Sequence, residues 1–142
     1  MFLGRYSHNV DTKGRLAIPA RFRDALGSEV VITRGIDRCL SLYPMEAWEP
    51  LAEKVSALSI SDPDARTFRR MVFAEASYLD VDRQGRILLP ADLRQYAHID
   101  REATVVGVHS YIELWSPERW VTQSQVMDEE ASSIAERLAE FI

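Results

Sequence analysis

Short apolar segments separated by turn residues run along the chain and predict strands and helices in a regular order. Alternating positions over 5–10 predict a strand, and 15–18 predicts the strand that returns after a turn. A helix follows at 19–26, because Pro19 suits the start of a helix and Gly27 ends it. The rest of this half is predicted as paired strands at 30–33 and 39–43, a helix from Pro44, and a helix from Asp64 to about Ala74.

The second half repeats this order. Strands are predicted at 77–81 and 86–89, a helix at 90–97, paired strands at 103–108 and 111–115, and a helix from Pro117. The tail from Asp128 predicts a final amphipathic helix, whose apolar stripe is Ala131, Ile134, Ala135, Leu138 and Phe141. Short strands, tight turns and a core shared between the halves favour an α+β fold, a small barrel with helices around it.

The repetition extends to the residues themselves. The segment 10–20, VDTKGRLAIPA, returns as 81–91, VDRQGRILLPA, at an offset of 71, and Gly35 matches Gly107 at an offset of 72. Two copies of a long period indicate a duplicated module, since a solenoid needs three or more stacked units. Each half has only about 70 residues, near the lower limit for a self-sufficient core. We therefore expect the halves to share a core or to depend on other subunits.

Composition is that of a soluble globular protein, with 46% hydrophobic and 27% charged residues in 142. No apolar run of about 18 residues exists, which predicts no membrane-spanning segment, and the N-terminus lacks the apolar core of a signal peptide. Cys39 is the single cysteine and cannot form an internal disulfide, so we expect a cytoplasmic protein.

The net charge of −5 is unevenly distributed. Residues 1–38 hold seven Lys/Arg and four Asp/Glu, a net charge of +3, whereas residues 113–142 hold two and seven, a net charge of −5. The first copy of the repeated motif lies in the basic part, and the tail is acidic. This polarity leaves a nucleic-acid partner open despite the overall acidity.

The repeated turn, Asp-x-x-Gly-Arg, carries the candidate chemistry. Asp11 and Arg15 lie on either side of the bend, so their side chains can meet, and Gly14 supplies the positive φ that the bend needs. One interpretation is a turn-stabilising ion pair, worth well under about 1 kcal/mol when exposed. The other is an arginine held ready to bind guanine or phosphate, with Lys13 at the tip as a phosphate contact. The recurrence of the turn favours the second interpretation.

Enzymatic and metal-binding alternatives have less support. Two related aspartates from a duplicated barrel could form the dyad of an acid protease, but an arginine four residues on would keep each carboxylate ionised. No Gly-rich phosphate loop or Ser-His-Asp arrangement is present. We therefore expect no catalytic residue, no cofactor and no metal site, since metal-ligand spacing is absent among His8, His98, His109 and Cys39.

The doubled turn, each copy followed by apolar residues and Pro-Ala, resembles the MraZ family of bacterial transcriptional regulators, as does the opening GRYSHNVD at 4–11. The likeness covers essentially the whole chain. It implies two SpoVT-AbrB modules, at 5–47 and 76–119, folded as swapped hairpins into one pseudo-dimeric barrel, with a helical tail at 120–142. It also implies a ring-shaped homo-oligomer, associated with the nucleoid. That ring would bind short direct repeats of double-stranded DNA upstream of its own division and cell-wall gene cluster, usually repressing it.

The resemblance carries the motif arginines onto Arg15 and Arg86. We add Lys13, Arg5 and Arg83 as expected DNA contacts. The residues expected to shape the turns are Asp11, Gly14, Asp82 and Gly85. In the second copy, Gln84 stands where the first copy has Lys13. Asp80 and Asp92 also make the second copy more acidic. We therefore expect DNA contact chiefly from the first copy. The alternative function is a protein-interaction or antitoxin-like module on the same barrel.

Overall fold

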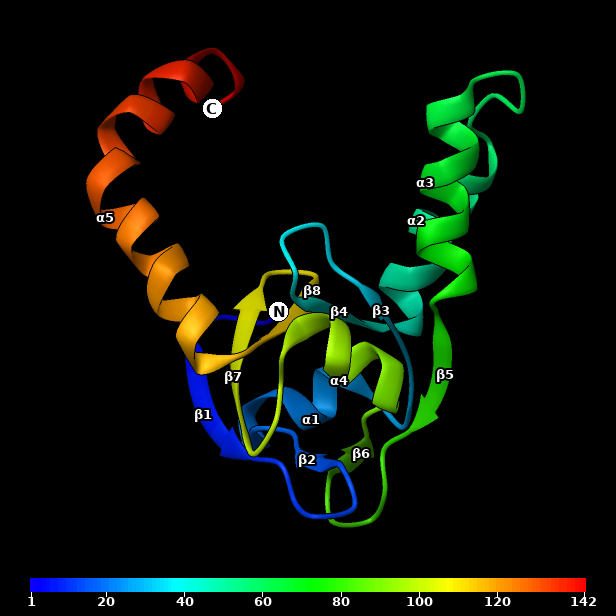
Figure 1. Cartoon of the computed structure of the whole chain (residues 1–142), viewed down its shortest axis with the longest axis vertical. Coiled ribbons are helices and arrows are strands. Elements are labelled where there is room, and N and C mark those ends of the chain that lie inside the picture. The colour runs from blue at the N-terminus through cyan, green and yellow to red at the C-terminus, as the bar shows by residue number, and fades with distance from the viewer.

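Six antiparallel strands form the main sheet of the computed structural model, which describes residues 1–142 (Figure 1). A separate two-stranded ribbon lies at one end of the molecule. The sheet runs in the order β1 (Arg5–Asn9), β7 (Glu102–Val108), β8 (Tyr111–Trp115), β4 (Leu40–Pro44), β3 (Glu29–Arg34) and β5 (Ser77–Asp80), and the ribbon consists of β2 (Arg15–Ala17) and β6 (Arg86–Leu88).

The two halves of the chain exchange strands. β1 pairs with β7 of the second half, β5 pairs with β3 of the first, and β2 pairs with β6. The strands on either side of the first turn, predicted as a strand and its return, share only the bridge between Val10 and Leu16. Within each half, the second predicted strand pair does form, as β3 with β4 and β7 with β8.

This exchange gives the halves one core. A single cluster of 19 buried residues draws on both halves, including Leu16, Phe22 and Ile32 from the first and Ile87 and Leu114 from the second. The predicted shared core is therefore confirmed, and so is the α+β class. No ladder joins the edge strands β1 and β5, so the strand pairings alone leave the sheet open.

Five α-helices complete the fold. α1 (Ala20–Leu26) and α4 (Ala91–Ala97) are short and carry core residues such as Phe22 and Leu93. α2 (Met45–Ser56) and α3 (Pro63–Ala74) pack together around Trp48, Val55 and Val72. α3 begins at Pro63, one residue before its predicted start, and the Asp62 carboxylate accepts a hydrogen bond from Asp64 N.

The tail differs from its prediction. The helix from Pro117 and the predicted helix from Asp128 are one continuous helix, α5 (Pro117–Leu138), followed by a 3₁₀ turn, η1 (Ala139–Phe141). No glycine or proline lies inside it to end the first segment. α5 contains no buried residue, and no other helix covers it as α3 covers α2.

The elements divide the molecule into two ends (Figure 1). α5 and the α2–α3 pair project from one side of the sheet, and the β2–β6 ribbon with its two turns lies on the other. Cys39 and Trp115 are buried. No helix is at once long and apolar enough to cross a bilayer.

Candidate nucleic-acid interface

The first turn is organised by the carboxylate of Asp11. Its Oδ1 accepts hydrogen bonds from the backbone N–H groups of Lys13 and Arg15, both at 2.9 Å. Its Oδ2 accepts a third from Arg15 Nε at 2.8 Å. Gly14 takes a φ of 86°, as the turn requires. The ion pair predicted between Asp11 and Arg15 is therefore present.

The second turn repeats this arrangement. Asp82 Oδ1 accepts from the backbone N–H groups of Gln84 and Arg86 at 2.9 Å, and Oδ2 accepts from Arg86 Nε at 2.8 Å. Gly85 takes a φ of 77°. The side chains of Arg15 and Arg86 are 33% and 29% exposed, so neither is buried away from a partner. Local geometry therefore gives Arg86 the same support as Arg15.

Hydrogen bonding determines the charge of both aspartates. The pKa of Asp11 lies below its usual value, chiefly because of the hydrogen bond from the Arg15 backbone N–H, and the Arg15 side chain adds to this. The pKa of Asp82 is lowered in the same way by Arg86. Both carboxylates stay ionised at neutral pH. This agrees with the rejection of an acid-protease dyad, which needs one protonated partner.

Each turn is also tied to the other half of the chain. The carbonyl of Gly14 accepts a hydrogen bond from Leu89 N at 2.9 Å, and the carbonyl of Gly85 accepts one from Ile18 N at 2.8 Å. Together with the β2–β6 ladder, these bonds place the two turns side by side at one end of the molecule (Figure 1). The turns therefore form one surface.

Two further arginines support the turns from beneath. Arg23 of α1 lies against Gly85, where a Cβ atom would come within 2.6 Å of its Cζ. Arg94 of α4 lies against Gly14, where a Cβ atom would come within 3.1 Å of its Nη1. The sequence identifies this pair only as an extension of the repeat. The sequence signal for this pair is that Arg23 and Arg94 stand 71 residues apart, at the same offset as the repeated segment.

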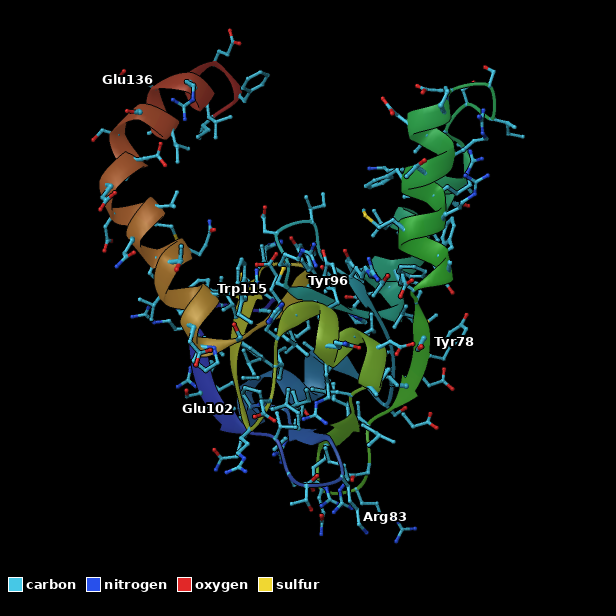
Figure 2. The ribbon with its side chains drawn as sticks, in the orientation of Figure 1. Tyr78, Arg83, Tyr96, Glu102, Trp115 and Glu136 are labelled. Atoms are coloured by element: carbon cyan, nitrogen blue, oxygen red, sulfur yellow. The ribbon has the colours of Figure 1, made fainter.

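The predicted contact residues are not all brought together. Lys13 and Arg83 are exposed near the tips of the two turns, and Figure 2 shows Arg83 extending away from the protein. Arg5 lies elsewhere, at the start of β1, where it lines a pocket with Trp120 and Asp128 of α5. The surface at the turns thus comprises four of the five predicted cations, namely Lys13, Arg15, Arg83 and Arg86.

Comparison with known proteins agrees with the duplication. The family model for the MraZ protein, described as antitoxin-like, matches twice, over residues 1–71 and 72–142. The chain belongs to the MraZ family. The two matches meet after residue 71, so they divide the chain into the two halves that exchange strands. The predicted tandem repeat is confirmed.

Relatives resemble the chain over its full length. A protein named transcriptional regulator MraZ from Thermomicrobium roseum is 68% identical over 142 residues, covering 100% of both chains. Proteins of the same name from Herpetosiphon aurantiacus and Roseiflexus castenholzii are 53% and 51% identical, each covering 99% of both chains. MraZ proteins are regulators, in agreement with the prediction that the chain is not an enzyme.

Proposed function

We propose that the chain is a cytoplasmic, nucleoid-associated DNA-binding regulator. It binds short direct repeats upstream of its own division and cell-wall gene cluster and represses that cluster. The observation that carries the proposal is the pair of identically braced arginines, Arg15 and Arg86, on adjacent turns. The names of the full-length relatives supply the regulatory role.

The bracing suits recognition of a base. Arg15 Nε donates to Asp11, and the structure records no protein partner for the two terminal nitrogens. Two parallel donors of this kind match the O6 and N7 acceptors of guanine in the major groove. A two-stranded ribbon is narrow enough to enter that groove, and β2–β6 is such a ribbon. Lys13 and Arg83 at the tips would then contact phosphates.

The chain is acidic overall and offers few cations to DNA, which favours an oligomer that combines the cations of several copies. Four cations at the turns bind DNA weakly, because affinity grows with the number of phosphates neutralised. Several copies joined in a ring would make those contacts intramolecular and multiply their effect. Head-to-tail contacts also present every copy in one orientation, which suits direct repeats. We propose a homo-oligomeric ring in which α5, uncovered within its own chain, contacts a second copy.

The finer architecture belongs to the same proposal. The SpoVT-AbrB units would span 5–47 and 76–119, with 120–142 as the helical tail, and the sheet and ribbon together would close as one barrel. The exchange of strands between the halves supports this, because each unit leaves its first strands to be paired by the other. A unit separated from its partner would expose unpaired strand edges.

A second candidate is an antitoxin-like module that binds a partner protein. The family description supplies only the antitoxin-like character. The uncovered helix α5 favours it, since a partner protein could cover that surface. DNA binding distinguishes the two candidates. The antitoxin-like role predicts that changes at Arg15 and Arg86 leave partner binding intact.

The test is titration of a fluorescent duplex that carries the DNA upstream of the chain's own gene. Binding should be strong at low salt and weaken steeply as salt rises. Arg15→Ala should cost about 1–3 kcal/mol if the arginine reads a base. Arg70→Ala is the matched control, since Arg70 is exposed on α3 at the other end of the molecule (Figure 1). Wild-type affinity in a variant lacking both Arg15 and Arg86 would disprove the contact assignment.

A further inference from the structure

The two turns have different neighbours, although their own geometry is the same. Residues 98–101 connect α4 to β7, whereas only residues 27–28 connect α1 to β3. The backbone N–H of Val10 donates to the carbonyl of Arg101 at 2.8 Å, and that of Val81 donates to Ser28 at 2.9 Å. Arg101 beside the first turn is thus the structural equivalent of Ser28 beside the second.

The longer connection shapes a groove beside the first turn. This groove has a volume of about 790 Å³, and its lining includes Asp11, Arg94, Asp100 and Arg101. The corresponding groove beside the second turn measures about 200 Å³. It is lined by residues that include Arg23, Ser28, Asp82 and Arg83. Each groove is lined by two arginines, and the first is the larger, with room for a bulky anion.

The arginines of the first groove are available to a ligand. Arg101 is exposed, and neither Arg101 nor Arg94 forms an ion pair. Arg94 Nη2 donates to the carbonyl of Asp100 at 2.8 Å, while its buried Nε has no partner. Because Arg15 already pairs with Asp11, two guanidinium groups face one free carboxylate, that of Asp100. The groove therefore favours an anion.

The acids near the two turns are equal in number. β1 ends in Asn9 beside the first turn, whereas β5 ends in Asp80 beside the second. Asp80 lies opposite Glu29 in the sheet, so two acids flank the second turn. Asn9 lies opposite Glu102, which together with Asp100 of the groove places two acids beside the first turn as well. The two sides differ instead in the exposed Arg101, whose place beside the second turn is taken by Ser28.

We propose that Arg101 binds a DNA backbone phosphate in this groove, with Arg94 lining its inner side. The assignment rests on the proposed DNA-binding function and adds a contact that only the first turn makes. Arg15 and Arg86 are braced equivalently, so by themselves they could meet a duplex in either direction. A phosphate contact on one side removes that equivalence, because backbone contacts fix register and orientation. Arg101 thereby sets the direction in which each chain lies on its repeat.

The first test measures how binding to a random-sequence duplex depends on salt, since phosphate contacts do not depend on sequence. Arg101→Ser should weaken binding about threefold or more and reduce the salt slope by about one per chain. Ser28→Arg installs the arginine at the equivalent place and should raise the slope. Arg70→Ser on α3 is the charge-matched control and should change neither. A wild-type slope in Arg101→Ser would overturn the proposal.

The second test locates the phosphate. A duplex selected from random DNA by the wild-type chain is ethylated at its phosphates, and the phosphates whose ethylation blocks binding are mapped. With the wild type, ethylation of one phosphate on a single side of each repeat should block binding. With Arg101→Ser, ethylation of that phosphate should have no effect. An identical pattern of blocking phosphates in both proteins would overturn the role of Arg101 but not the proposed function. Failure of the wild type to bind either duplex at low salt would instead refute the proposed function.

Discussion

Arg23, from the first half of the chain, lies against Gly85 at the tip of the second half's turn. Its Nε donates to the carbonyl of Ile18 at 2.9 Å, which holds the guanidinium in place. Ile18 N in turn donates to the carbonyl of Gly85. One half of the chain thus supports the recognition turn of the other, so the two turns cannot move independently.

This contact predicts unequal effects of alanine at the two turn glycines. Gly85→Ala and Gly14→Ala should each cost about 1–2 kcal/mol, because both positions have positive φ. Gly85→Ala should cost about 1 kcal/mol more, because the new methyl displaces Arg23 from its bond to Ile18. Urea denaturation of both variants measures the difference.

A double-mutant cycle with Arg23→Ala isolates the contact. Without the Arg23 side chain, Gly85→Ala should lose its extra cost and match Gly14→Ala. Equal costs for the two glycine variants in the wild-type background would contradict the packing of Arg23 on Gly85.

Asparagine at position 11 separates the shape of the turn from the orientation of its arginine. Asp11→Asn keeps an acceptor for the N–H groups of Lys13 and Arg15 but loses the charge that holds Arg15 Nε. Stability should change little, as for an exposed pair. Affinity for the upstream duplex should fall more than this. Unchanged affinity would support the interpretation that the ion pair only stabilises the turn.

Acid should weaken the turns through the same carboxylates. The pKa values of Asp11 and Asp82 are lower in the folded chain than their usual value of 3.8. The stabilisation they supply is therefore complete well above pH 3.8 and is lost as the pH falls through the lower folded values. The stability difference between the wild type and Asp11→Asn/Asp82→Asn should shrink toward zero over that range. Urea titrations from pH 6 downward would measure it, and a difference independent of pH would contradict the cause given for the shifts.

The element order and the turn could be predicted because their signals are local. Pro19 and Gly27 bound α1, Asp62 caps α3, and Asp11 reaches Arg15 across a bend only four residues long. Each of these features depends on neighbours in the sequence. Local chemistry therefore determined both the boundaries and the ion pair.

Strand partners could not be predicted in this way. β2 has three residues and a single buried side chain, Leu16, so its pattern is compatible with pairing to β1 or to β6. The packing of Arg23 on Gly85 depends on that choice, as does the position of Arg101 beside the first turn. The change of offset from 71 to 72 showed that a residue had been gained, but only the fold shows that the α4–β7 connection is longer.

Cys39 should be unreactive in the folded chain. Burial, together with the charges of Glu113 and Asp37, raises the pKa of its thiol to about 12. At pH 8 almost no thiolate is present, and the side chain is only 1% exposed. Alkylation by iodoacetamide should be negligible in buffer and complete in denaturant, as read by mass spectrometry. Rapid alkylation of the native chain would contradict this packing.

The tail helix should be dispensable for the fold of a single chain but needed for assembly. Met127, Ile134 and Leu138 lie on one stripe of α5, and no residue of this helix is buried. A chain ending at residue 127 should keep nearly the same thermal midpoint by circular dichroism. Its mass by light scattering should fall toward that of one chain, and its affinity for repeated sites should fall with the loss of linked contacts.

A pair of point variants separates the stripe from the charge of the helix. Leu138→Glu places a carboxylate on the stripe, whereas Ser132→Glu adds the same charge to the opposite side of α5. Leu138→Glu should dissociate the oligomer, because a charge buried at an apolar contact is costly without a partner. Ser132→Glu should leave the mass unchanged. If both variants keep the wild-type mass, copies of the chain do not associate through this stripe, and the surface that joins them lies elsewhere on the fold.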